Sequence, residues 1–503
     1  MSADLLLAID QGTTSTRAIA YDRELRPVAS AAIPLDTQHP KPGWVEQDPE
    51  QIIASVVESV GQVLDEVGGP GRIAAVGLDN QGETVVAWAA GTLRPLAPAI
   101  VWQCRRSGPI VDRLRERGLE PAIAARTGLP LDPYFSAGKL AWLLERDARV
   151  RVAARDGTLR FGTVDAWLTA RLDGGRARTD TSTASRTQLL SLATLDWDAD
   201  LLGWFGIERA TLPSIGPTAG DLGTIRHARW GAELPLRALA CDQQAALAGH
   251  AGFAPGRLKA TYGTGVFLLA NAGSRRVPVA GVETSIGWTL PSGRTDSVLQ
   301  GGVFAAGTVV DWLRDGLGFV ADTFETEAVA RAGDPASGVR LLPALSGLGV
   351  PWWRPDARAV VAGLTPAAGR PEVVRAAFDG IAHLVADVVD TIRPALVADP
   401  VELRVDGGLV ANRYLMERQA DLLGLPVAVA AARESTALGV AGLAGIGAGL
   451  LAPEAIALAN PTAERFEPRL DEATRRRERD AWRAFVESSL ASADAAGATG
   501  PRC

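Results

Sequence analysis

Three short turns rich in glycine and threonine contain the residues best suited to phosphate chemistry. The first turn contains Asp10, Gly12, Thr13 and Thr14, and Arg17 follows it. Backbone N–H groups and hydroxyls in such a turn can surround phosphate oxygens, and an arginine adds a permanent positive charge. A carboxylate fits among phosphates only if a cation stands between them, so this turn indicates a phosphate site with a metal ion. The alternative is an ordinary hairpin whose residues simply favour turns.

The second and third turns read "TYGTG" (261–265) and "DGG" (406–408). Glycine lets the backbone approach a ligand closely, but glycine-rich turns are common, so each turn alone is a weak signal. The sequence has no GxxxxGK[ST] run and no GxGxxG directly after an expected strand, so it lacks two familiar nucleotide-binding loops. The phosphate-site hypothesis therefore depends on the three turns together.

Asp242 is the best candidate for a general base. It follows the run "LRALAC" (236–241) and precedes two glutamines. A carboxylate at the end of a strand can accept a proton from an alcohol. It could instead cap a helix that begins near Gln243, and the two roles are compatible.

The stretch "DNQGET" (79–84) follows the apolar run "IAAVGL" (73–78). Asn80, Gln81 and Glu83 are costly to place beside a strand end without polar partners, so we expect them to face water or a ligand rich in hydroxyl groups. A single aromatic residue more often belongs to a core, but three of them could form the walls of a sugar-sized pocket. These are Trp102, Tyr134 and Phe267.

The segments around the first turn and "DNQGET" predict an α/β fold. Residues 5–22 predict strand, turn and strand, with apolar and polar residues alternating after the turn. Residues 49–67 have apolar residues at helical spacing behind Asp48 and Pro49, which suit an N-cap and a first helical turn. Residues 72–81 predict a further strand that ends in polar residues. Strands and helices therefore alternate, as α/β proteins require.

The second half of the chain repeats this pattern. Residues 257–273 again predict strand, turn and strand, and residues 401–424 predict a strand, a Gly-Gly turn and a helix that begins near Asn412. The tail beyond about residue 483 loses its hydrophobic pattern, and we expect it to fray.

Length and composition indicate a globular protein with two domains. A chain of 503 residues is too long for one ordinary core. Its 47% hydrophobic and 22% charged residues are typical of globular proteins. We expect an N-terminal domain over residues 1–248 and a C-terminal domain over residues 249–503, with the boundary near residues 245–256.

Charge and residue content argue against several other classes. The formal net charge of −7 disfavours a general nucleic-acid binder. With 3 cysteines, no CxxC pair and only 4 histidines, neither a disulfide framework nor a His/Cys metal site is expected. The first residues do not form a signal peptide pattern, and the Ala/Gly-rich run 435–452 predicts a buried helix rather than a membrane span. We therefore expect a soluble, cytoplasmic protein with no nucleic-acid or membrane partner.

A series of motifs, in order along nearly the whole chain, resembles the FGGY family of carbohydrate kinases, and within it the glycerol kinases most closely. The motifs include "AIDQGTTSTRA", "NQGET", "YFSAGKLAWLL", "DTSTASRT", "CDQQAAL", "TYGTGVF", "GGVFAAG" and "RVDGGLVANRYLM". The resemblance implies an α/β fold with two actin-like ATPase (ribonuclease H-like) domains and a catalytic cleft between them. It also implies ATP and Mg²⁺ as cofactors, a small polyol or sugar substrate, and a homo-oligomer such as a dimer or tetramer.

Matching the motifs residue by residue implies individual roles. Asp10 is implied to help hold Mg²⁺, and Asp242 is implied to be the catalytic base. The nucleotide and its phosphates are implied to contact Thr13, Thr14, Arg17, Thr264, Gly265, Gly307, Asp311, Gly408 and Asn412. The polyol is implied to contact Gly82, Glu83, Trp102, Tyr134, Asp242, Gln243 and Phe267.

Two positions depart from the family pattern. Gly82 stands where the family has an arginine that donates hydrogen bonds to the substrate, and Asp311 stands where glycerol kinases usually have glutamine. Losing a hydrogen bond from a charged donor costs about 1.5–3 kcal/mol, and the loss of the arginine also vacates the volume of a long side chain. Three explanations stay open: a water or another cation replaces the arginine, a longer polyol or ketose fills the space, or the site repacks.

The sequence thus predicts ATP-dependent phosphorylation of a primary hydroxyl of a small polyol, most directly glycerol to glycerol 3-phosphate. One alternative is a kinase for a tetritol, pentitol or pentulose. A second is a non-catalytic actin-like protein that binds nucleotide and polyol, which the intact Asp10 and Asp242 disfavour. A third is a hydrolase on the same fold that uses water in place of the alcohol.

Overall fold

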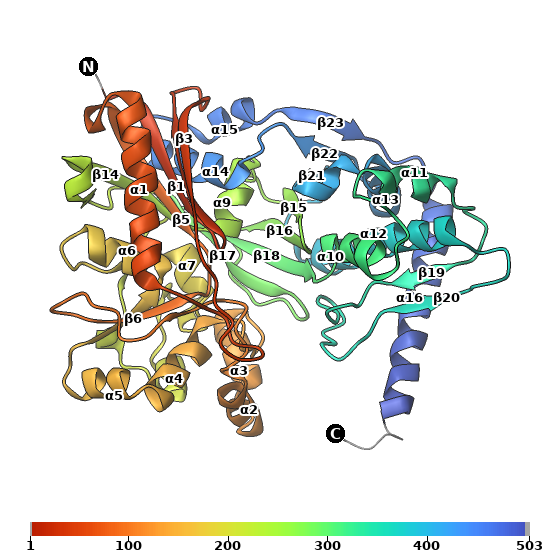
Figure 1. Cartoon of the computed structure of the whole chain (residues 1–503), viewed down its shortest axis with the longest axis horizontal. Helices are drawn as coiled ribbons and strands as arrows, with labels where there is room; N and C mark the ends of the chain where they lie inside the picture. The colour runs from red at the N-terminus through yellow and green to blue at the C-terminus, as the bar shows by residue number, and fades with distance from the viewer. Residues whose placement is uncertain (1–2, 498–503) are drawn as a thin grey trace.

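Two large β-sheets organise the chain, one in each half, in a computed structural model that describes residues 3–497. Figure 1 shows the first half, red to yellow, beside the second half, green to blue. The strands of the first sheet are, in spatial order, β13 (Thr224–Arg226), β14 (Glu233–Cys241), β5 (Ile73–Asn80), β1 (Leu5–Gln11), β2 (Ser15–Tyr21) and β3 (Pro27–Pro34).

The second sheet repeats the inner plan of the first. Its strands are β17 (Glu283–Thr289), β18 (Thr295–Val303), β16 (Val266–Gly273), β15 (Leu258–Tyr262), β21 (Leu403–Asp406), β22 (Val427–Ala430) and β23 (Thr462–Phe466). In each sheet an antiparallel three-stranded meander is continued by two parallel strands, β3-β2-β1-β5-β14 in the first and β18-β16-β15-β21-β22 in the second. The predicted α/β fold and both predicted strand–turn–strand units are confirmed.

Helix α1 (Pro49–Val67) crosses one face of the first sheet. Asp48 is its N-cap and accepts the backbone N–H of Glu50, and the apolar stripe that includes Ile52 and Val56 is buried against β2 and β3. The spacing of apolar residues therefore predicted both the limits and the buried face of this helix correctly.

The chain between β5 and β14, together with the short strand β4 (Glu46–Gln47) that precedes α1, forms a smaller, added α/β layer, at the lower left of Figure 1. Its four-stranded sheet has the order β4, β7 (Ala99–Ile100), β6 (Val85–Ala89) and β8 (Leu159–Thr163). Its helices are α2 (Gly108–Glu116), α3 (Glu120–Thr127), α4 (Ser136–Arg146), α5 (Ala148–Arg155), α6 (Val164–Leu172), α7 (Thr181–Ser185) and α8 (Ala199–Phe205). Two-stranded pairs join β10 (Leu190–Ser191) to β11 (Asp196–Trp197) and β12 (Ser214–Gly216) to β9 (Arg178–Asp180).

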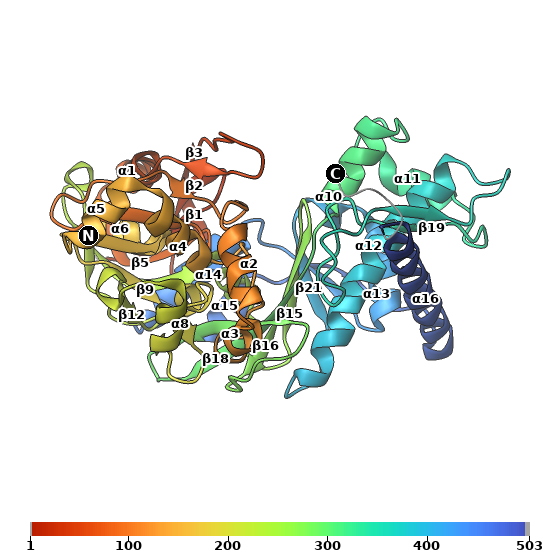
Figure 2. The same cartoon turned by 90° about the horizontal axis from the view of Figure 1, so that it is seen from below.

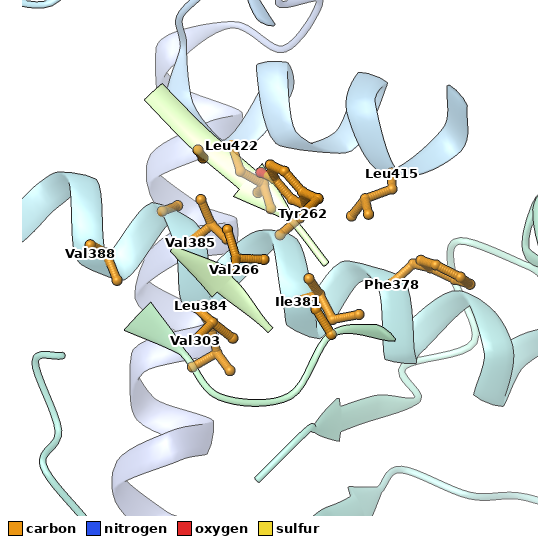
Figure 3. Close-up of a cluster of buried hydrophobic side chains, with 14 of the residues drawn as sticks. Tyr262, Val266, Val303, Phe378, Ile381, Leu384, Val385, Val388, Leu415 and Leu422 are labelled. Atoms are coloured by element: carbon orange, nitrogen blue, oxygen red, sulfur yellow. The ribbon is translucent and has the colours of Figure 1, made fainter. Parts of the chain in front are cut away.

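A core of aliphatic side chains fixes the strand ends of the second sheet. Figure 3 shows Ile381, Leu384 and Val385 of α12 (Arg370–Ile392) packed beside Val266 and other strand residues. Fully burying such a side chain contributes about 1.5–3 kcal/mol. The remaining helices of this half are α10 (Gly307–Asp311), α11 (Glu325–Ala332) and α13 (Arg413–Leu423), and β19 (Arg340–Leu342) pairs with β20 (Val360–Ala362). The turn between β15 and β16 therefore rests on a rigid base.

Helix α14 (Ser435–Gly447) follows β22 of the second sheet but packs on β1, β5 and β14 of the first, beside α9 (Asp242–Gly249). Figure 1 shows this late helix among the strands of the first half, with α15 (Pro453–Ala459) next to it. A Cβ atom on Gly439 would overlap the carbonyl oxygen of Ala245, so the crossing requires glycine. The prediction of a buried, tightly packed helix here is confirmed, and within residues 3–497 no helix is both long and apolar enough to cross a bilayer.

The prediction of a frayed tail is wrong as far as residue 497. Helix α16 (Glu472–Gly497) runs along the second half, as Figure 2 shows. Trp482, Phe485 and Val486 are buried, and the Trp482 ring stacks on His383 with centroids 4.7 Å apart. These apolar residues are too few to mark a helix from sequence, but packing makes it stable. The rest of the tail, 498–503, lies outside the described residues.

Candidate active site

A small buried cavity of about 70 Å³ lies between the first sheet, the added layer and the second sheet. Gly82 and Glu83 reach it from the end of β5, Asp242 and Gln243 from the start of α9, and Phe267 from β16. The added layer contributes Trp102 and Tyr134, whose ring centroids are 5.7 Å apart. The structure thus brings together every residue that the sequence assigned to the polyol: Gly82, Glu83, Trp102, Tyr134, Asp242, Gln243 and Phe267.

Asp242 is the first residue of α9, with Cys241 at the N-cap. Its Oδ1 accepts the backbone N–H of Gln243 at 2.7 Å and faces the Cys241 thiol at 3.4 Å. Burial raises the pKa of Asp242 despite these donors. A carboxylate with a raised pKa is a better proton acceptor than one in water, as a general base for an alcohol requires.

Glu83 occupies an unusual backbone position beside Asp242. Its φ is +52°, a left-handed conformation that is rare for residues other than glycine and that costs of order 1–3 kcal/mol. Its Oε1 accepts a hydrogen bond of 2.6 Å from Nε of Arg186. Burial raises the pKa of Glu83, and the charge of Arg186 opposes that rise. Strain of this kind is typical of residues that are held for a ligand.

The amides of Asn80 and Gln81 are buried and do not face water, and their N–H groups have partners in the chain, whereas Oδ1 of Asn80 has none among the described residues. Asn80 donates to the carbonyl oxygen of Ala240 at 3.2 Å, and Gln81 donates to the side-chain oxygens of Gln11 and Gln47 at 3.2 and 2.9 Å. These bonds tie together the ends of β1, β5 and β14. Only the tertiary structure supplies such partners, because they come from distant parts of the chain.

The thiol of Cys241 lies close to Gly82. A Cβ atom at position 82 would lie 2.7 Å from Sγ of Cys241, closer than real Cβ atoms approach a neighbour. Cys241 also lines the cavity, and burial raises the pKa of its thiol. The thiol therefore stands where a side chain at position 82 would begin.

A chain of polar contacts joins α9 to the second sheet. Buried Lys259 donates to Oε1 of Gln243 at 3.0 Å and to the hydroxyl of Thr261 at 2.9 Å. Thr261 donates to Asp406 at 2.6 Å, and Asp406 is 2.9 Å from Nε2 of His250. Although burial opposes it, contact with His250 lowers the pKa of Asp406. This network links the base-bearing helix to the strand that ends in the third glycine turn.

In the first turn, Thr13 and Arg17 have partners that the sequence did not reveal. Thr13 accepts a hydrogen bond of 2.9 Å from the indole of Trp102 and lines the cavity. Arg17 forms an ion pair with Glu434, the N-cap of α14, and Thr14 is exposed. The first turn therefore adjoins both the cavity and the helix that returns from the second half.

Asp10 faces a second carboxylate, Asp79, which is paired with it across β1 and β5. Burial raises the pKa of Asp10 to about 6, and the charges of Asp242 and Glu434 act in the same direction. Asp79 is fully buried, and its carboxylate oxygens accept from no N–H or hydroxyl group of the described chain; their hydrogen-bonding contact is with the carboxyl of Asp10. Burial and the Asp10 charge raise its pKa as well.

These two carboxylates fit a magnesium ion bound jointly with phosphates. Among the described residues, no group of three or more His, Cys, Asp or Glu side chains could hold a metal by itself. Mg²⁺ in phosphotransferases is usually bound by one or two carboxylates, substrate phosphates and water. The buried oxygens of Asp79, which accept from no N–H or hydroxyl group of the described chain, are the feature that such an ion would satisfy.

The turn between β15 and β16 is built by close backbone packing. The N–H of Gly307 donates to the carbonyl of Gly263 at 2.9 Å, and the N–H of Ala306 donates to that of Thr264 at 2.9 Å. A Cβ atom on Gly265 would lie 2.5 Å from the carbonyl oxygen of Val303. The start of α10 is therefore pressed against the turn, next to the exposed Thr264.

The other predicted nucleotide residues lie around this turn. Gly408 begins a short 3₁₀ helix after β21, and a Cβ atom there would meet nothing within 4 Å in the described chain. Asn412 caps α13 by accepting the N–H of Leu415 at 2.9 Å. Asp311 ends α10, is exposed and pairs with Arg314 at 3.1 Å. Gly408 therefore has open space beside it, whereas the side chain of Asn412 is engaged as the N-cap of α13.

Comparison with known proteins agrees with this arrangement. The model of the FGGY family of carbohydrate kinases, N-terminal domain, matches residues 5–249, and that of the C-terminal domain matches residues 258–448. The chain belongs to the FGGY family of carbohydrate kinases. The family assignment made from the sequence motifs is confirmed, as is the two-domain α/β kinase fold.

Among FGGY proteins of known function, the chain is similar to glycerol kinases from bacteria. It is 45% identical to the glycerol kinase of Citrifermentans bemidjiense over 489 residues, which cover 97% of this chain and 99% of that protein. It is also 45% identical to the glycerol kinase of Thermus brockianus over 485 residues, covering 96% and 98% of the two chains.

Solved FGGY structures have the same fold. The crystal structure of Plasmodium falciparum glycerol kinase with ADP matches with a TM-score of 0.92 and 31% identity, covering 97% of this chain and 99% of that one. The ligand-bound xylulose kinase of Lactobacillus acidophilus matches with a TM-score of 0.87 at 23% identity, covering 97% and 98%, which indicates a shared fold only.

Four residues at the candidate site carried no role in the sequence analysis. They are Asp79, Arg186, Cys241 and Gln300. Arg186 is part of the motif "DTSTASRT", and Asp79 opens the stretch "DNQGET". A charged residue next to an apolar strand was the available signal for Asp79. Gln300 lies inside β18 without any such signal.

Proposed function

We propose that this protein transfers the γ-phosphoryl group of ATP to a primary hydroxyl of glycerol. One observation carries the proposal. Asp242, a half-buried carboxylate at the start of α9, lines the same small cavity as Glu83 and Thr13, and Thr13 belongs to the first glycine/threonine turn. Similarity to bacterial glycerol kinases over nearly the full chain supports glycerol as the acceptor.

In this mechanism Asp242 accepts a hydrogen bond from the attacking hydroxyl and takes its proton as the bond to phosphorus forms. Phosphoryl transfer depends mainly on positioning and on stabilising negative charge, so the protein need only orient the two substrates. Glu83 and Gln243 orient the other hydroxyls, while Trp102, Tyr134 and Phe267 cover the carbon atoms. Their apolar surfaces also keep water, a competing nucleophile, away from the phosphorus.

Residues of both halves hold the nucleotide in this proposal. Asp10 and Asp79 hold Mg²⁺, which when bound neutralises charge on the phosphates. Thr13, Thr14 and Arg17 serve the phosphates from the first sheet, and Thr264, Gly265 and Gly307 serve them from the second. Gly408, Asp311 and Asn412 lie on the nucleotide side of the cleft. The proposed N-terminal domain covers residues 1–248 and the C-terminal domain residues 249–503, a boundary close to the end of α9 at Gly249 and before the start of β15 at Leu258.

A longer acceptor is the second candidate. The cavity adjoins a larger one of about 410 Å³, and the two share Trp102, Tyr134, Phe267 and Gln300. A four- or five-carbon polyol or ketose could extend into that space. The small volume around Asp242 and Glu83 favours glycerol.

The test is ADP release from Mg·ATP with glycerol, dihydroxyacetone, tetritols, pentitols and pentuloses, and Asp242→Asn as the control. Highest kcat/KM for glycerol supports the proposal. A clear preference for a longer acceptor moves the assignment to the second candidate. ADP release that no acceptor stimulates would identify a hydrolase, and the absence of any turnover would favour a non-catalytic binding protein.

A further inference from the structure

Arg186 is a buried guanidinium at the wall of the polyol cavity. It follows α7 as its C-cap residue, its side chain is 1% exposed, and it lines the cavity together with Gly82 and Glu83. Its guanidinium lies 5.8 Å from the ring centroid of Tyr134 and 5.2 Å from that of Phe135. The added layer therefore delivers a cation into the site from a segment far from Gly82 in sequence.

Two of the three guanidinium nitrogens are already engaged. Nε donates to Glu83 at 2.6 Å, and Nη2 donates to Glu283 at 2.8 Å. Nη1 is fully buried and has no hydrogen-bond partner anywhere in residues 3–497. A buried charged donor without a partner is expensive. Arg106, Arg404 and Arg479 also each have one buried nitrogen without a partner in the described chain, but of these four arginines only Arg186 lines the polyol cavity.

A matching acceptor lines the same cavity. Oε1 of Gln300 is buried and likewise has no partner in the described part of the chain. Gln300 stands on β18 directly opposite Glu283, which binds Arg186. A hydroxyl can accept from a guanidinium and donate to an amide oxygen at the same time. One cavity thus contains a donor and an acceptor that both lack partners, and a polyol would satisfy both.

Position 82 cannot supply the missing donor by itself. Any side chain there begins 2.7 Å from Sγ of Cys241, and Gly82 has none. Arg186 lines the same cavity but belongs to the added layer, and its Nε donates a hydrogen bond to Glu83, the neighbour of Gly82. The charged donor that the polyol needs is therefore present, but it comes from another element.

We propose that Arg186 binds the polyol: Nη1 donates a hydrogen bond to a substrate hydroxyl, Nε holds Glu83 in its strained position, and Oε1 of Gln300 accepts from the substrate. The proposal deepens the proposed function and rests on it. It predicts that the binding of one particular hydroxyl of the acceptor depends on Arg186.

The test compares Arg186→Lys with wild type, using glycerol, propane-1,2-diol and propane-1,3-diol as acceptors. Lysine keeps the positive charge beside Glu83 and Glu283 but lacks the planar fork that reaches three partners. We expect kcat/KM for glycerol to fall roughly 10- to 100-fold. In wild type, deleting the hydroxyl that Arg186 contacts should also cost roughly 10-fold or more, and in Arg186→Lys that loss should shrink to within about 2-fold.

Arg106→Lys is the matched control. Arg106 is another buried arginine of the first half, pairs with Glu46 at 2.6 Å and stacks on Trp44 at 3.9 Å, but does not line the cavity. This variant should keep the wild-type losses for both diols. Equal losses for both diols in wild type and Arg186→Lys would overturn the proposal, since a merely structural arginine would lower all rates alike.

Two further measurements separate the possible failures. Circular dichroism and ADP affinity establish whether Arg186→Lys is folded. If it is not, a crystal structure of wild type with its best acceptor decides: Nη1 within about 3.2 Å of a hydroxyl oxygen supports the proposal, and a longer distance overturns it. If wild type turns over no acceptor, the proposed function has failed. If wild type prefers a longer acceptor, deoxy analogues of that acceptor replace the two diols in the test.

Discussion

The turn between β1 and β2 is bordered by carboxylates, whereas the equivalent turn between β15 and β16 consists of glycine and threonine. Asp10 and Asp79 stand at the first turn with raised pKa values, and Arg17 pairs there with Glu434. At the second turn Thr261 takes the place of Asp10 and is paired with Asp406, whose pKa is, despite burial, lowered by contact with His250. The shape of this turn depends on backbone contacts with the start of α10. The same strand–turn–strand unit is thus built in two chemically different ways.

The difference follows from what each sheet stands beside. The first sheet adjoins the added layer and α9, whose first residue is Asp242. The ends of its strands therefore carry acidic residues and border the polyol cavity. The second sheet adjoins α10 and the 3₁₀ helix at Gly408, which leave free backbone around an exposed threonine. One half is suited to proton and metal chemistry, and the other to holding phosphates by backbone N–H groups. Substitutions in each half test this division.

The largest effect is expected for Asp242→Asn. Asparagine keeps the shape of the side chain but cannot take a proton, so kcat should fall by about 10²- to 10⁴-fold. The KM for ATP should stay close to wild type, because in the proposed mechanism Asp242 contacts the polyol and not the nucleotide. Initial rates of ADP release measure both constants, and a kcat within a few-fold of wild type would remove Asp242 from its role.

Asp79→Asn should weaken metal binding by about 10- to 100-fold. We expect this because the substitution removes one of two facing carboxylates, and changes next to a metal ligand commonly have effects of this size. Mn²⁺ binding to the protein–ADP complex, followed by electron paramagnetic resonance, is the measurement. Unchanged Mn²⁺ affinity in a folded variant would contradict the two-carboxylate site.

Gly439→Ala should lower the free energy of unfolding by about 1–3 kcal/mol. The added methyl overlaps the backbone of Ala245, where the helices α14 and α9 cross and join the two halves. Gly203→Ala, in α8, is the control, since its Cβ meets nothing within 4 Å in the described structure and alanine favours a helix by up to about 1 kcal/mol. Urea unfolding compares the two, and equal stabilities would mean that the crossing tolerates side chains.

Gly265→Ala should raise the KM for ATP roughly 10-fold and leave the KM for the polyol nearly unchanged. The reason is the 2.5 Å approach of its Cβ to the carbonyl oxygen of Val303, which forces the second turn to move. Gly91→Ala, a loop glycine with open space around it, serves as the control. If the polyol constant changes more than the ATP constant, the division between the halves is wrong.

The smallest effect concerns pH. Because the pKa of Asp10 is about 6 in the folded protein and near 3.8 otherwise, the native state holds a proton that the unfolded state has lost between these values. Stability without metal should therefore fall as pH rises from about 4 to about 6, relative to Asp10→Asn. Mn²⁺ affinity should rise over pH 5–7, since the ion replaces that proton. Flat profiles in both measurements would contradict the shifted pKa.

Local patterns predicted the inner hairpin of each sheet and the parallel strand next to it, whereas β3, β13, β17, β18, β22 and β23 were not predicted. Alternating apolar residues predicted the hairpins at 5–22 and 257–273, and Asp48 with Pro49 predicted the start of α1. Residues 483–497 were missed because their few apolar positions form a helix only by packing on the second half. Local pattern also could not show that α14 returns to the first sheet, since that depends on the shape of the glycine crossing.

By itself the sequence determined the family, because its motifs are short contiguous runs of residues. The resemblance to that family implied the residues that the structure brings together in the cavity. Only the tertiary structure decided which side chains complete the site. Asp79 faces Asp10 because β5 lies beside β1, and Arg186 reaches Glu83 because the added layer folds back over the end of β5. Such partners are set by strand order and by close packing between distant segments, which no local pattern of residues records.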